Sequence, residues 1–180
     1  DNDYHITVLF QQMKEGAAGY FRTQDEYQKV QAPDSNEREM VYLAAKGIFS
    51  PITKSYLAHE FTHLITFNQK DRLRGVEEET WLNELRADYS PTLLGYDEEY
   101  QGSNLQQRVR QFISSPSDSL TEWQAQNSDY GVINIFSQYL VEHYGIKILA
   151  DSLHSKEAGI PSLNKALKEN GYRKNFSQVF

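Results

Sequence analysis

Two histidines that lie four residues apart, with a glutamate after the first, are the feature that most constrains this chain. His59, Glu60 and His63 form the pattern His-Glu-x-x-His inside residues 51–68, where apolar residues recur at helical spacing. On a helix the Cβ atoms of such a pair lie roughly 5–6 Å apart on one face, so both imidazoles can reach one zinc ion at about 2.0–2.1 Å. Glu60 points about a quarter turn away, where it can meet a water molecule without binding the ion. The sequence therefore predicts a helix that carries two zinc ligands and a general base.

A second predicted helix, residues 78–90, supplies acidic groups for the same site. A catalytic zinc ion takes three protein ligands and keeps one open position, so two histidines need a third donor. Glu84 is that donor in our interpretation, because it stands among apolar residues. Asp88 follows one turn later on the same face, where it can accept the outer N–H of a ligating histidine and fix its orientation. The alternative is that these carboxylates form an ordinary solvated stripe and the histidines are ordinary helix residues.

Length, charge and composition exclude several classes of protein. A chain of 180 residues is expected to form one domain, and the absence of cysteine removes disulfides, thiolate nucleophiles and cysteine-bound metals. A net charge of −7 with scattered Lys and Arg argues against nucleic acid as a partner. The apolar runs are too short to span a membrane. The chain opens on Asp1-Asn2-Asp3 without a basic and apolar leader, so we expect a mature or excised fragment.

The order of the predicted elements indicates an α+β fold. Strands are predicted at residues 4–10, 20–27 and 38–45 from their alternating or apolar character. Besides the two helices above, helices are predicted at residues 103–113, 131–144, 146–153 and 163–168, with a further element beginning at 176. The charged run 70–79 is expected to be solvated. Within the single domain 1–180, residues 1–69 would then form a small mixed sheet with the motif helix, and residues 70–180 a helical part.

Taken together, the two motifs resemble the gluzincins, the zinc metallopeptidase clan of thermolysin and the zinc aminopeptidases. The clan pattern is H-E-x-x-H with a downstream N-E, and here H-E-F-T-H is followed by W-L-N-E-x-x-A-D-Y. The resemblance implies a zincin-like fold, one catalytic zinc ion bound by His59, His63 and Glu84, and Glu60 as general base. It places Asp88 behind His59 and Asn83 beside the ligands.

Leu85 and Arg86 depart from the W-x-N-E-G-x-A pattern of the aminopeptidase branch. This departure concerns the packing next to Glu84 and not the ligands themselves.

Weaker similarity over most of the chain points to the secreted, hyicolysin-like branch of the clan. It is carried by the opening strand, by N-E-R-E-M-V-Y-L at residues 36–43, and by D-Y-G at residues 129–131 before a helix. In related enzymes a tyrosine before such a glycine donates its hydroxyl to the oxyanion, so the resemblance nominates Tyr130. The alternatives for this donor are Tyr89, Tyr96 and His143. The same resemblance implies secretion.

The implied function is a zinc-dependent peptidase that hydrolyses peptide bonds of peptide or protein substrates with metal-activated water. The chain has no G-x-M-E-N segment, which anchors a free amino terminus in the aminopeptidase branch, and this favours an endopeptidase. An aminopeptidase-type gluzincin is one alternative. Another is an inactive, zinc-stabilised binding module, although Glu60 argues against it because structural zinc sites are usually closed by four protein ligands. A domain that binds no metal and carries the histidines by chance is a third.

Two further expectations concern the substrate and a second metal. In known zincins an extended substrate pairs with the edge strand before the zinc helix, and the resemblance nominates residues 38–45 for this role. Calcium is compatible with the acidic composition but is not indicated, because no set of carboxylates converges by spacing alone. The sequence does not indicate the oligomeric state.

Overall fold

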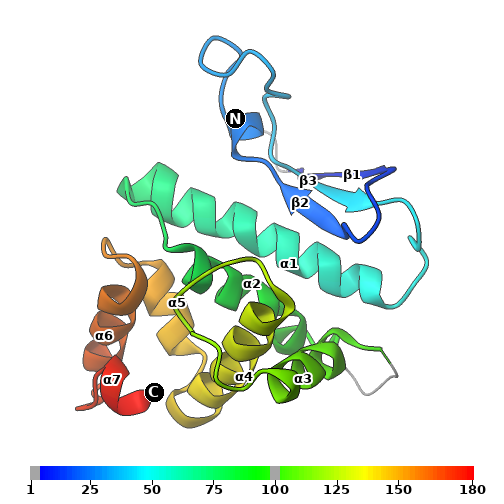
Figure 1. The fold of residues 1–180 in the computed structure, drawn as a ribbon. Helices are drawn as coiled ribbons and strands as arrows, with labels where there is room; N and C mark the ends of the chain where they lie inside the picture. The colour runs from blue at the N-terminus through cyan, green and yellow to red at the C-terminus, as the bar shows by residue number, and fades with distance from the viewer. Residues whose placement is uncertain (1–4, 98–101) are drawn as a thin grey trace.

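The computed structural model describes residues 5–97 and 102–180, and it combines a small sheet with a mostly helical remainder. Helix α1 lies between the two parts, with the sheet on one side and the other helices on the opposite side (Figure 1). The strands are β1 Thr7–Gln11, β2 Gly19–Phe21 and β3 Met40–Ala44. The helices are α1 Ile52–Phe67, α2 Thr80–Leu93, α3 Asn104–Ser114, α4 Asn127–Tyr144, α5 Lys147–Leu153, α6 Gly159–Glu169 and α7 Phe176–Val179.

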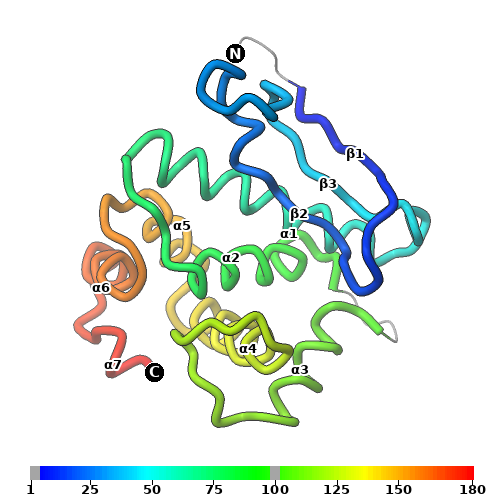
Figure 2. The backbone as a smooth tube through the Cα atoms, turned by 45° about the horizontal axis from the view of Figure 1, so that its top comes forward, coloured from blue at the N-terminus to red at the C-terminus, as the bar shows by residue number. Residues whose placement is uncertain are grey.

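The sheet is mixed, and its strand order is β1-β3-β2 (Figure 2). β3 runs parallel to β1 and antiparallel to β2, so it is the central strand. The prediction that residues 38–45 form the substrate-binding edge is therefore wrong. Met40, Val41, Tyr42 and Leu43 are all buried, which is typical of a strand covered on both faces. Among the described residues, β2 has no strand partner on its outer edge.

The predicted strand 20–27 is correct only at its start. β2 ends at Phe21, and Thr23–Glu26 form a short 3-10 turn instead. The buried Asp25 explains this turn, because its carboxylate accepts hydrogen bonds from the Asn36 backbone N–H at 2.9 Å and the Tyr42 hydroxyl at 2.5 Å. Burial and the neighbouring Asp25 raise the pKa of Tyr42 to about 12.

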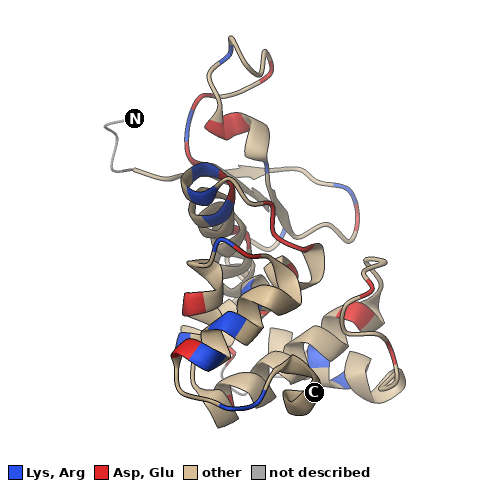
Figure 3. Cartoon of the chain, turned by 90° about the vertical axis from the view of Figure 1, so that its left-hand side faces the viewer, with Lys and Arg blue, Asp and Glu red and all other residues tan. Residues whose placement is uncertain are grey.

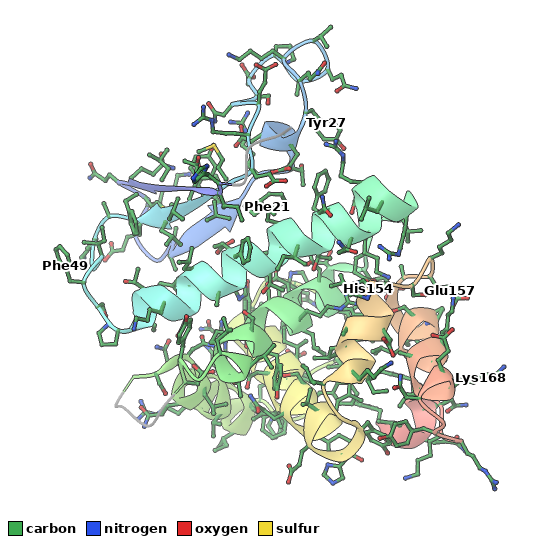
Figure 4. The ribbon with its side chains drawn as sticks, turned by 180° about the vertical axis from the view of Figure 1, so that it is seen from behind. Phe21, Tyr27, Phe49, His154, Glu157 and Lys168 are labelled. Atoms are coloured by element: carbon green, nitrogen blue, oxygen red, sulfur yellow. The ribbon has the colours of Figure 1, made fainter. Side chains whose placement is uncertain are left out.

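Aromatic side chains attach the sheet region to α1. The rings of Phe21 and Tyr27 lie 5.8 and 5.9 Å from the ring of Phe67, and both side chains lie beside α1 in Figure 4. Such ring pairs add to the free energy gained from burial alone. This contact fixes β2 against the helix that carries the His-Glu-x-x-His motif.

The chain between α1 and α2 differs from its prediction. A π-helical turn, η2 Asn68–Arg72, continues α1, and Lys70 and Glu78 are buried rather than solvated. The reason is that these charges pair with one another, and Lys70 also donates to backbone carbonyls of the segment between α5 and α6. α2 also continues past Ser90 to Leu93 with Pro91 inside its last turn.

The helical part has its own core, formed by the inner faces of α2, α4, α5 and α6 with α7. α4 begins at Asn127, four residues before the predicted start, because Gln126 and Asp129 form a capping box there. Acidic and basic residues are interspersed along the chain (Figure 3). None of the helices in the described ranges is long and apolar enough to cross a bilayer.

Candidate metal centre and active site

Helices α1 and α2 pack side by side and bring three predicted ligands together. The Nε2 atoms of His59 and His63 lie 3.1 Å apart, and the carboxylate of Glu84 lies 3.3 Å from the first and 3.6 Å from the second. Ligands about 2.0–2.2 Å from one tetrahedral zinc ion lie about 3.3–3.6 Å from each other. The three side chains therefore fit a single ion.

The hydrogen bonding of these groups supports the same fit. His63 Nδ1 lies 3.1 Å from the Asn83 amide oxygen, so a proton on Nδ1 can donate to that oxygen and leave the Nε2 lone pair free for a metal ion. Glu84 Oε2 is buried and has no hydrogen-bond partner among the described residues. A cation held between these atoms would take the place of the proton that they otherwise have to share. The donor set of two imidazoles and one carboxylate is that of a catalytic zinc site.

The electrostatics of the triplet reflect this crowding. Burial works to lower the pKa of His59, but the facing carboxylate of Glu84 leaves it above its usual value. Burial and the neighbouring His59 lower the pKa of His63. Burial works to raise the pKa of Glu84, but the two histidines hold it below its ordinary range. The two histidines therefore favour the ionised form of Glu84, which is the form in which a carboxylate binds a metal ion.

Asp88 lies behind the site and is fully buried. Its carboxylate is 3.9 Å from His59 Nδ1, which is longer than a hydrogen bond but places it on the outer side of that ring. Arg108 on α3 donates to both of its oxygens, from Nη2 at 2.7 Å and from Nε at 2.9 and 3.1 Å. The buried Asn134 on α4 donates to it at 2.8 Å. Three helices thus fix the carboxylate that faces His59.

Glu60 lies beside the ligands on α1, with its side chain packed against β2. Burial raises the pKa of its carboxyl to about 7, while the nearby His59 and the Phe21 backbone N–H act in the opposite direction. An ideal Cβ on Gly19 would come within 2.8 Å of Glu60 Cγ, so glycine is needed for this close approach. A carboxyl with a pKa near the working pH is suited to general-base chemistry.

Tyr130 lies in the first turn of α4 and lines the same cavity as His59 and Glu60. Its ring stacks under the Arg108 guanidinium at 4.5 Å and meets Trp123 edge-on at 4.9 Å. Burial raises its pKa further above the ordinary value, so the hydroxyl keeps its proton and can donate it.

The other donors considered for this role lie elsewhere. Tyr89 is buried in the helical core, and Tyr96 lines a different pocket near the start of α1. His143 is on the exposed side of α4, where its ring faces the Tyr139 carbonyl.

Arg108 and Asn134 are the site residues that sequence reasoning missed. Both lie on helices that were predicted, but nothing in the local pattern distinguishes them. Arg108 contacts a carboxylate that lies twenty positions earlier in the chain, and Asn134 contacts the same carboxylate from forty-six positions later. The one signal for them was Asp88. A carboxylate that is buried needs a cation or hydrogen-bond donors around it, so partners such as Arg108 and Asn134 could have been expected.

Comparison with known proteins gives a similarity to a metalloprotease. No protein-family model matches the chain. The neutral metalloprotease ShpI of Staphylococcus hyicus is 26% identical over 164 residues, which cover 78% of this chain and 35% of that protein. The chain therefore spans about a third of the length of this curated relative. The similarity is weak, and it supports a relationship with the metallopeptidases.

Proposed function

We propose that this chain is the catalytic part of a zinc peptidase of the gluzincin type with a zincin-like fold. Within that clan we assign it to the hyicolysin-like branch. The observation that carries the proposal is the convergence of His59, His63 and Glu84 at distances that suit one zinc ion, with Glu60 beside them. The similarity to a neutral metalloprotease supports it independently. Substrates would be peptides or proteins, and a secreted location follows from the family resemblance.

Each residue has a distinct task in peptide hydrolysis. A bound zinc ion would supply a Lewis acid that polarises the scissile carbonyl and acidifies water. Glu60 accepts a proton from the attacking water and later passes it to the leaving nitrogen. The Tyr130 hydroxyl donates to the oxygen on which negative charge develops. Asp88 and Asn83 keep the two imidazoles oriented.

The shape of the site favours an endopeptidase. One cavity is bordered by His59 and Glu60 and by residues of α3, and another is bordered by His63, Asn83 and Phe21. Cavities beside both histidines would accommodate substrate residues on either side of the scissile bond. The outer edge of β2 runs beside Glu60 and replaces β3 as the strand with which an extended substrate would pair.

The decisive experiment is the Glu60→Gln variant. It should bind zinc as the parent does, while turnover of a peptide substrate falls by at least about a hundredfold, because a general base contributes that much. Metal content by mass spectrometry and cleavage of a mixed peptide library measure the two effects. Full activity of the variant would remove Glu60 from the mechanism. A parent protein that binds zinc but cleaves nothing would favour the binding module.

A further inference from the structure

The cavity beside His59 and Glu60 has an unusually polar wall on the side of α3. Its volume is about 400 Å³, and it lies between α1, α3, the start of α4 and the segment before β2. Asn104, Gln107, Arg108 and Gln111 all line it. These positions follow one another at helical spacing, so α3 presents one continuous hydrogen-bonding face to the cavity.

Two buried polar groups at this cavity are available to a ligand. Ser55 on α1 is buried and lines the cavity, yet its hydroxyl has no hydrogen-bond partner in the described part of the chain. Asn104 is only 6% exposed and lines the cavity from the first turn of α3. Buried polar groups in native proteins nearly always have partners. The unpartnered hydroxyl of Ser55 therefore indicates a ligand that can hydrogen-bond, and the Asn104 amide lines the same cavity.

The charge of this wall is balanced. Arg108 is the one Lys or Arg in the lining contributed by described residues, and its Nε and Nη2 already bind the Asp88 carboxylate. Its Nη1 donates to the Gln111 side chain at 3.1 Å. An acidic ligand would compete with Asp88 for the guanidinium, and a basic one would meet Arg108, because Glu60, the acidic residue in the lining contributed by described residues, lies on α1 and not on this wall. Burial of either charge would be costly.

We propose that this wall forms a specificity pocket for a neutral hydrogen-bonding side chain, such as asparagine or glutamine, next to the scissile bond. The inference rests on the proposed function and adds the class of substrate. A leucine or phenylalanine side chain would displace water from Ser55 and from the α3 amides without replacing its hydrogen bonds. A site built to hydrogen-bond its ligand discriminates strongly against an analogue that cannot do so.

The test is cleavage-site profiling on a synthetic peptide mixture that presents all residues on both sides of the cut. Asparagine or glutamine should be preferred over leucine at one flanking position by at least about tenfold. Asn104→Leu should lower this ratio at least about fivefold with unchanged zinc content, since it removes one hydrogen-bonding partner. Gln107→Leu tests the same wall should Asn104→Leu fail to fold. Gln28→Leu, an exposed amide outside the cavity, should leave the ratio unchanged.

A binding measurement separates this inference from the proposed function. The zinc-loaded Glu60→Gln variant is titrated by calorimetry with two alanine pentapeptides that carry a central glutamine or leucine. Tighter binding of the glutamine peptide supports the pocket even if the parent cleaves nothing. Cleavage beside leucine or phenylalanine, with equal or tighter binding of the leucine peptide, overturns the pocket and leaves the peptidase proposal intact. Absence of cleavage and of any preference in binding overturns both.

Discussion

At the residue scale, the candidate site consists of groups that are each held by a second group. His63 is oriented by Asn83, Asp88 is held by Arg108 and Asn134, and Glu60 packs against β2. Fixed partners reduce the reorganisation needed when charge develops during a reaction. The proposed ligand Glu84, the base Glu60 and the donor Tyr130 can therefore be substituted one at a time, because each substitution leaves the contacts of the other two in place.

Glu84→Ala tests the third ligand. Mutation of a residue that hydrogen-bonds to a metal ligand typically lowers the metal affinity about 10- to 100-fold. Loss of the ligand itself should weaken zinc binding at least as much. A competition titration with a chelator measures the affinity. Glu142→Ala is the matched control, since Glu142 is an exposed glutamate on α4. Glu78 is unsuitable as a control because it is buried in an ion-pair network. Equal affinities in the two variants would refute the ligand assignment.

Tyr130→Phe tests the oxyanion donor. Removal of one such donor typically lowers kcat by about 10²–10³-fold. The ring remains, so its stacking on Arg108 and its contact with Trp123 should persist, and zinc content should not change. Steady-state kinetics on one peptide separate kcat from KM. Unchanged kcat would assign the role to another donor.

At the element scale, the approach of α4 to α3 depends on one glycine. An ideal Cβ on Gly131 would lie 2.4 Å from the backbone nitrogen of Phe112 and 2.8 Å from the carbonyl carbon of Gln111. Both atoms belong to the α3 backbone, so no side chain can move aside. The two helices that carry Arg108 and Tyr130 are therefore set at their distance by this contact.

Gly131→Ala should force α3 and α4 apart and destabilise the protein by about 1–3 kcal/mol, as overpacking of a core does. For a chain of this size, that corresponds to a fall in Tm of about 2–4 °C per kcal/mol. Thermal unfolding followed by circular dichroism measures the shift. Glu142→Ala, on the exposed side of the same helix, should melt like the parent. An unchanged Tm for Gly131→Ala would show that the two helices separate without cost.

The elements that the sequence predicted well are those whose signal is local. The periodicity of α1, and the apolar character of β3, are contained in short windows and place both elements correctly. The position of β3 in the sheet is not local, because it depends on pairing with β1 and β2 from distant parts of the chain. The same holds for the site. A four-residue spacing nominates His59 and His63, whereas Arg108 becomes visible only once α3 packs on α4 and its guanidinium reaches Asp88.

At the scale of the whole molecule, a buried ion network connects the end of the motif helix with the carboxy-terminal helices. Lys70, in the turn after α1, donates to the backbone carbonyls of Ser155 and Glu157 at 3.2 and 2.5 Å. Figure 4 shows that His154 and Glu157 lie at the same end of the molecule, beside α5 and α6. Glu78 joins Lys70 at 3.3 Å and Arg86 of α2 at 2.8 Å. Segments more than eighty residues apart are thereby held against the two helices that carry the site.

Glu78 makes this network sensitive to acid. Burial works to raise its pKa, but Arg86, the Gly159 backbone N–H and Lys70 hold it below the ordinary value of 4.5. A carboxyl with a depressed pKa in the folded state stabilises the protein above its unfolded-state pKa. This contribution is lost as the pH falls below about 4.5 and through the folded-state pKa.

Glu78→Gln should lower the free energy of unfolding at pH 7 by about 3–5 kcal/mol, because it leaves two buried cations without their carboxylate. Between about pH 5 and about pH 3, the free energy of unfolding of Glu78→Gln should fall less steeply than that of the parent, because the titrating carboxyl group is gone. Urea unfolding across this range measures both effects. Glu77→Gln, one position earlier and exposed, should stay within about 0.5 kcal/mol of the parent. Parallel acid curves for the parent and Glu78→Gln would mean that Glu78 does not carry the acid sensitivity.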